Sequence, residues 1–246
     1  MKKKYFGTDG IRAPSNSQKL NGLTMMRLGM ALGKVFTKGE HRHRVVIGKD
    51  TRLSGYTIEQ AITSGLLSMG LDVLLLGPIP TPGVAMLTKS MRADLGIMIS
   101  ASHNSYLDNG IKIFDKNGNK LSDETEIEIE HLMESELQNS LAGPEKIGRA
   151  KRLEDANGRY IEFLKGTFPK SQRLDGLKIV IDCANGASYI SAPLILWELG
   201  AEVIQIATQP NGTNINFECG STNTLSLIHI SEPTRRYAIS YAVFCL

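Results

Sequence analysis

Residues 44–76 read RVVIGKDTRLSGYTIEQAITSGLLSMGLDVLLL, a stretch in which short apolar runs flank a helical pattern. Val45–Ile47 is wholly apolar, which is typical of a strand buried on both faces of a parallel sheet. Apolar residues at helical spacing follow, and we expect Ser54 to cap that helix and Gly70 to end it. The next apolar run, Leu71–Leu76, predicts a second strand. This order of elements indicates an α/β protein.

The same alternation continues on both sides of this stretch. Upstream, Thr24 is expected to cap a helix with one apolar face. Downstream, Pro82 opens a short helix, Leu95–Ile99 predicts a buried strand, and Ile111–Phe114 predicts another. The segment 127–137 favours a helix, although its alternation of Ile and Glu also permits a strand.

The pattern restarts after a Gly-Pro linker that follows residue 141. The elements expected there are a helix around 160–164, a strand at 177–181, a helix at 193–199 and a strand at 203–206. The predicted fold is therefore α/β, with one complete domain built on a mixed or parallel sheet, residues 1–143. The start of a second, incomplete domain of the same type covers residues 150–224.

The last stretch, residues 225–246, does not continue this pattern. Residues 225–235 (LSLIHISEPTR) and 239–246 (ISYAVFCL) resemble the translated ends of a DNA-sequencing adapter. A natural C-terminal tail is the alternative. We expect the segment to be non-native and to have no defined structure, and we exclude it from the fold.

Composition excludes several classes of protein. The chain of 246 residues has 28 Lys and Arg against 25 Asp and Glu, so its net charge of +3 does not indicate general nucleic-acid binding. No apolar run approaches the roughly 18 residues of a membrane span, and no signal peptide is recognisable. Three dispersed cysteines form neither a disulfide framework nor a metal cluster. We expect a cytoplasmic protein without nucleic-acid or membrane partners.

The most informative loop is Ser100–Asn104 (SASHN), followed by Asp108–Lys112 (DNGIK). It lies where the predicted strand Leu95–Ile99 ends, and ligands of open parallel sheets bind beyond the carboxyl ends of strands. Small residues there allow backbone N–H groups to approach a phosphate, and a serine hydroxyl can accept a phosphoryl group. The alternative is a turn whose side chains satisfy only its own backbone.

Two further polar loops carry cations suited to anions. Phe6–Arg12 (FGTDGIR) combines glycines with Arg12, whose guanidinium can bind an oxyanion through two N–H groups. The segment GKDTR supplies Lys49 and Arg52 after another predicted strand. A tight turn with a surface arginine and an ordinary helix-start loop are the respective alternatives. Together the three loops indicate a phosphate-binding crevice.

A Ser-His hydrolase is a competing interpretation. It requires an imidazole nitrogen within hydrogen-bond distance of the serine oxygen. His103 directly follows Ser102, and neighbouring side chains on extended backbone diverge. No Gly-x-Ser-x-Gly turn surrounds either serine of the loop. The sequence therefore disfavours acyl hydrolysis.

These motifs together resemble those of the α-D-phosphohexomutases. The resemblance also includes residues 182–187 (DCANGA) and 219–222 (CGST), so it extends over residues 4–224. The opening GTDGIR is most similar to that of the bacterial members that act on glucosamine phosphates. A phosphomannomutase or phosphoglucomutase, and a non-catalytic phosphate-binding module, are the alternatives.

The resemblance implies an isomerase that interconverts glucosamine 6-phosphate and glucosamine 1-phosphate, for the synthesis of UDP-N-acetylglucosamine and the cell wall. It implies that Ser102 carries a phosphoryl group and exchanges it with the sugar through a hexose bisphosphate intermediate. Mg²⁺ would be held partly by the Ser102 phosphate. Lys112 and His103 are the other expected catalytic residues. Arg12, Lys49 and Arg52 are expected to bind phosphate or substrate.

The sequence also departs from the family pattern. Ser105 stands where a proline commonly follows His-Asn, and Ala13 where a glycine is usual. The family's Asp-Gly-Asp-x-Asp-Arg metal loop, its Glu-x-Ser-Gly-His sugar loop and its C-terminal phosphate-binding loop do not occur. We therefore expect the chain to stop within the second of four domains and to be inactive alone.

Overall fold

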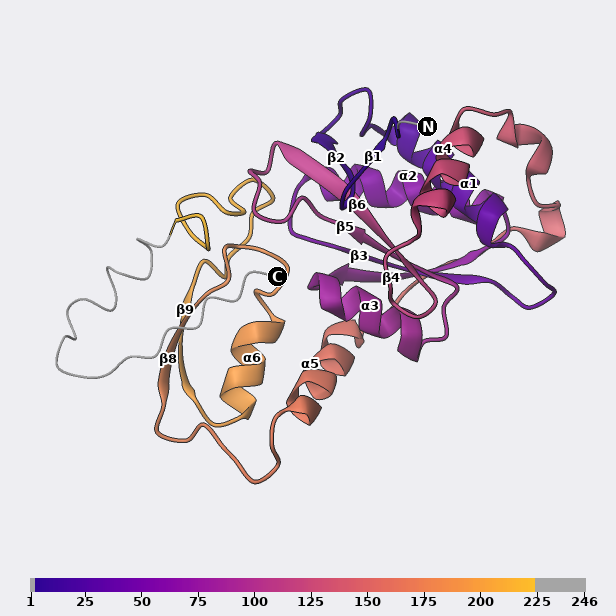
Figure 1. Ribbon diagram of the computed structural model, residues 1–246. Coiled ribbons are helices and arrows are strands. Elements are labelled where there is room, and N and C mark those ends of the chain that lie inside the picture. Colours follow the sequence, from indigo (N-terminus) through magenta and orange to yellow (C-terminus); the bar gives the residue numbers. More distant parts are fainter. Residues whose placement is uncertain (1–2, 224–246) are drawn as a thin grey trace.

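The structure is a computed structural model that describes residues 3–223 (Figure 1). Its first elements are β1 (Phe6–Gly7), β2 (Gly10–Pro14), α1 (Gly22–Phe36), β3 (Arg44–Lys49), α2 (Ser54–Ser68), β4 (Asp72–Pro78), α3 (Thr81–Ser90), β5 (Leu95–Ile99), β6 (Asp108–Asp115) and α4 (Asp123–Met133). Two short 3-10 helices (Leu137–Ser140 and Pro144–Lys146) precede β7 (Ala150–Arg152), α5 (Ala156–Thr167), β8 (Lys178–Asp182), α6 (Ser191–Glu198) and β9 (Glu202–Ile206). The residues 225–246, for which an adapter origin was inferred, lie outside the described part.

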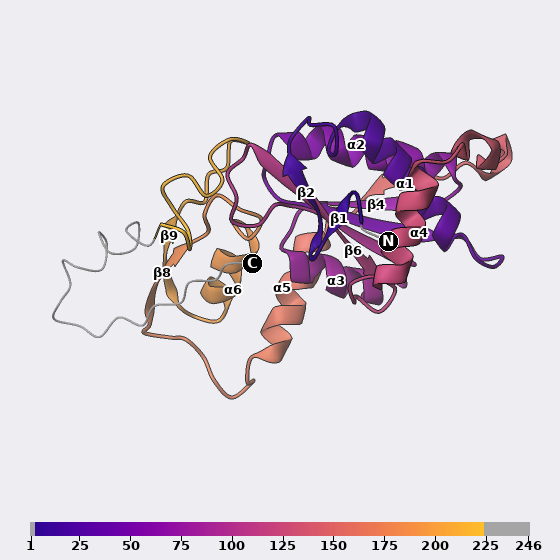
Figure 2. The same cartoon turned by 45° about the horizontal axis from the view of Figure 1, so that its top comes forward.

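The first part of the fold is built on a seven-stranded mixed sheet with the strand order β1-β2-β6-β5-β3-β4-β7. The strands β5, β3, β4 and β7 are parallel, whereas β2 and β6 run antiparallel to their neighbours. Helices α1, α2 and α4 cover one face and α3 covers the other (Figures 1 and 2). The α/β class and the mixed sheet expected from the sequence are confirmed.

The apolar run in β3 is explained by burial on both faces of this sheet. Val45 and Ile47 belong to the larger core, under α1 and α2. Val46 points the opposite way, into a smaller core that includes Tyr160 of α5. Because successive strand residues face opposite sides, three consecutive apolar residues are needed where both sides are covered.

Both predicted helix caps are wrong, and the reasons are local. Helix α1 is capped by Asn21, whose side chain accepts the Thr24 N–H at 3.0 Å. Helix α2 has no side-chain cap, and Ser54 is its first residue rather than its cap. The Ser54 hydroxyl instead accepts a hydrogen bond from Asn109 at 2.8 Å. The ambiguous segment after residue 122 forms a helix, α4, which Ser122 caps.

The later part of the chain contains the expected second strand-helix-strand pattern. Strands β8 and β9 pair in parallel, from Lys178↔Glu202 to Asp182↔Ile206, and α5 packs against α6 and α3. Strand β7 was not anticipated; it joins the first sheet beside β4. The division into residues 1–143 and 150–224 stays a prediction, although β7 ties the beginning of the second unit to the first sheet.

Among the described residues, no helix is both long enough and apolar enough to cross a bilayer.

Candidate functional site

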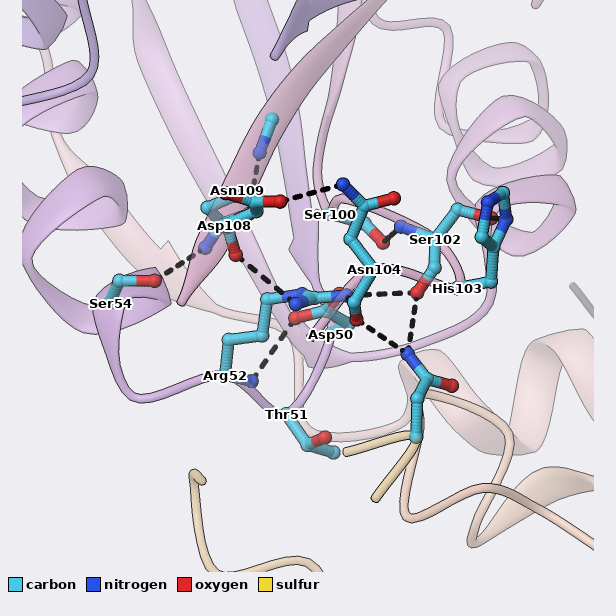
Figure 3. Close-up of polar contacts among 12 residues, drawn as sticks. Asp50, Thr51, Arg52, Ser54, Ser100, Ser102, His103, Asn104, Asp108 and Asn109 are labelled. Atoms are coloured by element: carbon cyan, nitrogen blue, oxygen red, sulfur yellow. Dashed lines mark hydrogen bonds and ion pairs between the residues drawn. The ribbon is translucent and has the colours of Figure 1, made fainter. Parts of the chain in front are cut away.

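The polar loops singled out in the sequence meet at one end of the sheet. Strands β3 and β5 are parallel neighbours, and their last residues, Lys49 and Ile99, face each other in the register. The loop that follows each strand therefore begins at the same edge. Figure 3 shows residues 50–54 of one loop lying directly against residues 100–109 of the other.

Ser102 occupies a strained position on this loop. Its φ of 58° lies in the left-handed region, which is unfavourable for a residue with a Cβ. Its N–H donates to the hydroxyl oxygen of Ser100 at 3.0 Å. Ser100 is buried, whereas the Ser102 side chain is partly exposed. The turn thus presents the hydroxyl of Ser102 and withdraws that of Ser100.

The prediction that the Ser102 and His103 side chains diverge is wrong. The Ser102 Oγ and His103 Nδ1 are 3.5 Å apart, because the left-handed conformation of Ser102 removes the extended backbone that the prediction assumed. This separation is at the outer limit of a hydrogen bond. His103 is exposed and lies beside the hydroxyl (Figure 3).

Arg52 holds the loop from beneath. Its side chain is fully buried, and its Nε donates to Asp50 Oδ2 at 2.8 Å. Its two terminal nitrogens donate to four main-chain carbonyls, those of Ser102 (2.8 Å), Asn104 (3.0 Å), Ser105 and Asp108 (3.1 Å). A guanidinium has five N–H donors, so all of them are engaged by the protein. The expectation that Arg52 binds phosphate or substrate is therefore replaced by a supporting role.

Lys49 also differs from the expectation. It is buried rather than presented to the crevice, and its Nζ lies 2.7 Å from Glu59 Oε2. The same ammonium lies 4.0 Å from the centre of the Tyr56 ring. At the end of β3 the Lys49 side chain lies against α2, which carries both Glu59 and Tyr56. Lys49 is thus an interior ion-pair partner in this structure.

Arg12 and Lys112 do lie at the edge of the site. Arg12 on β2 is exposed and donates to Asn104 Oδ1 at 3.3 Å. Lys112 on β6 is partly exposed, and its Nζ lies 2.6 Å from Asp9 Oδ2, in the turn between β1 and β2. The opening motif therefore makes two separate contacts here: Arg12 contacts the Ser100–Asn104 loop directly, and Asp9 contacts β6.

Gly10 explains how that motif approaches β6 so closely. Its φ is +84°, and a Cβ at this position would lie 2.1 Å from the carbonyl oxygen of Ile111. No side chain fits there, so the glycine is required by close backbone packing.

Asn216 is a residue of the site that sequence reasoning missed. Its Nδ2 donates to the carbonyls of Ser102 and Asn104, both at 2.9 Å. It lies in a polar segment without periodicity, where nothing in the sequence distinguishes it from its neighbours. Two further contacts join the same parts of the chain: Thr51 donates to the Asn185 carbonyl, and the Leu53 N–H donates to the Gly212 carbonyl at 2.8 Å.

A small cavity of about 70 Å³ lies between the loops of the two parts. It is lined by Asp50, Met98, Ser100, Ser102, His103, Cys183, Ala184, Gly186, Ala187, Ser188, Ile215, Asn216 and Ser221. Four residues of the segment 182–187 singled out in the sequence thus line the same cavity as Ser100 and Ser102. Burial raises the pKa of the Cys183 thiol to about 11, so the thiol that lines this cavity is protonated at neutral pH.

The described residues alone do not make a divalent-metal site beside Ser102. Within residues 3–223, the one cluster of three or more His, Cys, Asp or Glu side chains with converging ligand atoms lies elsewhere, at His41, His43 and Asp94. Asp50, which lines the cavity beside Ser102, is occupied by Arg52. Hard cations require several oxygen ligands, and residues 3–223 place no such group of ligands beside the Ser102 oxygen.

Comparisons with known proteins agree with this arrangement. Residues 3–140 match the family model described as phosphoglucomutase/phosphomannomutase, alpha/beta/alpha domain I. The chain is 65% identical over 222 residues to phosphoglucosamine mutase of Parvibaculum lavamentivorans, covering 90% of this chain and 50% of that protein. The corresponding enzyme of Granulibacter bethesdensis is 63% identical over 220 residues, covering 89% and 48%. The chain therefore spans about half the length of these relatives.

Solved structures show the same fold. A phosphoglucomutase/phosphomannomutase family protein from Burkholderia thailandensis superposes with a TM-score of 0.71 at 25% identity, over 86% of this chain and 45% of that one. A Thermus thermophilus protein with the proposed name phosphomannomutase gives 0.78 at 25% identity, over 94% and 52%. By its sequence, and by the sheet that it shares with these structures, the chain belongs to the phosphoglucomutase/phosphomannomutase family.

Proposed function

We propose that this chain is the N-terminal part of an enzyme that interconverts glucosamine 6-phosphate and glucosamine 1-phosphate. The proposal rests on the Ser102 turn. This turn presents one hydroxyl at the carboxyl end of β5, and Arg52 holds the turn through a hydrogen bond to the Ser102 carbonyl. The relatives at 60–65% identity that bear the name phosphoglucosamine mutase favour glucosamine over mannose or glucose. A cytoplasmic location and a role in cell-wall precursor synthesis are part of this proposal.

Ser102 is proposed to carry the phosphoryl group. In the forward step, the bond between the Ser102 Oγ and phosphorus breaks as a sugar hydroxyl oxygen bonds to the same phosphorus. The sugar hydroxyl loses its proton, and Ser102 Oγ regains one, so a hexose bisphosphate and a free serine result. In the return step, the phosphoryl group at the other sugar position is transferred to Ser102. Positioning and charge stabilisation dominate such a reaction.

The other expected catalytic groups are assigned from their places around that hydroxyl. His103 lies 3.5 Å from the Ser102 Oγ and is proposed to exchange its proton. Lys112 and Arg12, on adjacent strands, are proposed to stabilise phosphate oxygens at the mouth of the site. Lys49 and Arg52 are left out of this role, because both are buried and engaged by the protein.

A divalent metal, Mg²⁺ by resemblance, belongs to the proposed complete enzyme. A phosphate on Ser102 would give it oxygen ligands, and the remaining ligands would come from outside the described residues. The metal would neutralise charge during transfer. The same reasoning extends to the sugar-orienting groups, so the 246-residue chain is proposed to be inactive alone, with residues 225–246 a non-native tail.

Phosphoryl transfer to the serine tests the assignment of Ser102. Because the 246-residue chain is proposed to lack part of the site, the test uses the Parvibaculum lavamentivorans relative, with substitutions at the serines that match Ser100 and Ser102. Each protein is incubated with glucosamine 1,6-bisphosphate and Mg²⁺, and peptide mapping by mass spectrometry locates any phosphate. We expect phosphate on the serine matching Ser102 in the parent and in the Ser100→Ala counterpart, and none in the Ser102→Ala counterpart. Phosphate on the serine matching Ser100, with full activity after loss of that matching Ser102, contradicts the proposal.

A coupled assay tests the substrate and the inactivity of the chain. Glucosamine 6-phosphate, mannose 6-phosphate and glucose 6-phosphate are each supplied with Mg²⁺ and a bisphosphate primer. We expect no turnover by the 246-residue chain, and preference for glucosamine 6-phosphate by the gene product read past codon 224. Turnover of roughly 1 s⁻¹ or more by the short chain would show that the described residues suffice. Preference for another sugar phosphate would contradict glucosamine 6-phosphate as the proposed substrate.

A further inference from the structure

A second cluster of polar side chains lies at the opposite end of the sheet from Ser102. His41 and His43 precede β3, and Asp94 precedes β5. Because β3 and β5 are parallel neighbours, the residues that enter them are adjacent; the Asp94 N–H donates to the Arg44 carbonyl at 2.8 Å. His41 is exposed, whereas His43 is only 4% exposed.

The two imidazoles converge on one carboxylate. His41 Nε2 lies 2.8 Å and His43 Nδ1 lies 3.5 Å from Asp94 Oδ1. The ring centres of the two histidines are 4.0 Å apart. Residues two apart on an extended segment share a face, which accounts for this pairing. One ligand atom from each of the three residues can be chosen so that all lie within 4.8 Å of one another.

His43 supplies an independent reason to expect a ligand. Neither of its ring nitrogens has a hydrogen-bond partner within the described part of the chain, although both are buried. A buried polar group without a partner costs about 1–3 kcal/mol, and such groups are rare. The 3.5 Å separation from Asp94 does not meet hydrogen-bond geometry. A cation coordinated by the ring would satisfy one of these nitrogens.

The surrounding charges permit such a cation. Arg42 is engaged by Asp72 through two hydrogen bonds of 2.7 and 2.9 Å, and Arg44 donates to the Met91 carbonyl. Both guanidinium groups are therefore directed to other partners. The Arg44 N–H donates to Asp94 Oδ2 at 2.8 Å, which leaves Asp94 Oδ1 facing the two histidines.

We propose that His41, His43 and Asp94 bind a divalent transition-metal ion of the Zn²⁺ type. Imidazole nitrogen and a carboxylate oxygen are suitable ligands for such ions, and water would complete a tetrahedral shell. Bonds of about 2.0–2.1 Å place tetrahedral ligands about 3.3 Å apart, and the two distances to Asp94 Oδ1, 2.8 and 3.5 Å, are close to that spacing. His41 is exposed, which gives the ion access.

The site joins the segments that enter two central strands, and it lies at the far edge of the sheet from the proposed phosphoserine. Its role is therefore structural, and it is independent of the proposed mutase reaction.

Titration with Zn²⁺ alone tests the proposal. Untagged, metal-free protein is titrated by calorimetry, as the parent and as His41→Ala, Asp94→Asn and, as a matched control, His131→Ala on α4. We expect one equivalent bound by the parent and the control, and at least tenfold weaker binding by each ligand variant. His41 is exposed, so its replacement leaves the fold intact; unchanged thermal unfolding of the metal-free variants checks this.

A second readout locates the ion. Added Co²⁺ should broaden the ring C–H NMR signals of His41 and His43 while leaving those of His131 sharp. Absence of binding, or binding that His41→Ala and Asp94→Asn leave unchanged, overturns the proposal. Broadening confined to other histidines does the same.

Discussion

The guanidinium of Arg52 and the main-chain carbonyl of Ser102 are 2.8 Å apart, although 50 positions separate them in the sequence. This contact links the loop after β3 to the proposed nucleophile after β5. Arg52 is fully buried, and its guanidinium donates to one carboxylate, that of Asp50, and otherwise only to backbone carbonyl oxygens. The conformation of the turn is therefore fixed by a side chain that does not reach the solvent.

Arg52→Lys should loosen that turn. Lysine keeps the charge beside Asp50 but lacks the planar fork that reaches four carbonyls. We expect the free energy of unfolding to fall by at least about 2 kcal/mol, and amide exchange of residues 102–108 to become faster. Thermal unfolding and hydrogen-exchange mass spectrometry measure the two effects.

Arg42→Lys is the matched control for that change, because Arg42 is half exposed and pairs with Asp72. An exposed pair contributes about 1 kcal/mol or less, and this one is remote from the turn. Equal effects of the two variants on exchange at residues 102–108 would contradict the role given to Arg52.

The buried pair of Lys49 and Glu59 should be sensitive to loss of either partner. Both side chains are less than one-tenth exposed, and removal of one leaves an uncompensated charge in the interior. We expect Lys49→Met or Glu59→Leu to lower the free energy of unfolding by about 3–5 kcal/mol, with much of the loss recovered in the double variant. Denaturant titration of the parent, the two single variants and the double variant gives the coupling free energy between Lys49 and Glu59. Strictly additive losses would show that the two groups do not compensate each other.

Asp72 should contribute stability that depends on pH. The hydrogen bonds from Arg42, opposed by partial burial and aided by the Arg149 N–H, hold its pKa below the ordinary value. A depressed pKa in the folded state stabilises the protein above the unfolded-state value of about 3.9, and this gain is lost as pH falls through the folded-state value. Asp72→Asn should therefore lower the thermal midpoint at pH 7 and have a smaller effect near pH 3.

The control for pH is Asp155→Asn, which removes an exposed carboxylate that pairs with the equally exposed Arg159. Little change is expected at either pH, because solvent screens an exposed pair. If Asp72→Asn lowers the thermal midpoint more near pH 3 than at pH 7, the predicted direction of the pH dependence is wrong.

The thiols of Cys183 and Cys219 should resist alkylation. Burial raises the pKa of each to about 11, so roughly a thousandth of each thiol is ionised at pH 8, and the thiolate is the reactive form. Iodoacetamide should label both slowly in the folded protein and rapidly in denaturant. Peptide mapping reports them separately from Cys245. Fast labelling of Cys183 in the native protein would show that the cavity beside Ser102 is open to solvent.

The sequence predicted the framework of the fold because burial leaves a periodic signal. The strand Leu95–Ile99 was placed at its observed bounds, and β3 was recognised from three apolar residues that face two cores. Helix starts were less predictable. Asn21 and Thr24 are both good caps, and the choice between them depends on where the chain leaves the preceding turn.

The site was predictable in position but not in the direction of its side chains. The sequence placed Ser102, Arg52 and Lys49 after strand ends; Ser102 and Arg52 lie in loops at that edge, whereas Lys49 is the last residue of β3 itself. It could not show that Arg52 and Lys49 turn inward, since that depends on Asp50 and Glu59 as partners. The same limit applies to Ser102, whose left-handed backbone has no signature in residue type.

Asn216 and Arg52 donate to the same two carbonyl oxygens, those of Ser102 and Asn104. Each oxygen has two lone pairs, so both are saturated when the later part of the chain is in place. Of the two donors, only Arg52 also contacts the Ser105 and Asp108 carbonyls, and it comes from the loop after β3. The Ser102 turn is therefore already held by the first part of the chain, and Asn216 adds a second donor from the later part.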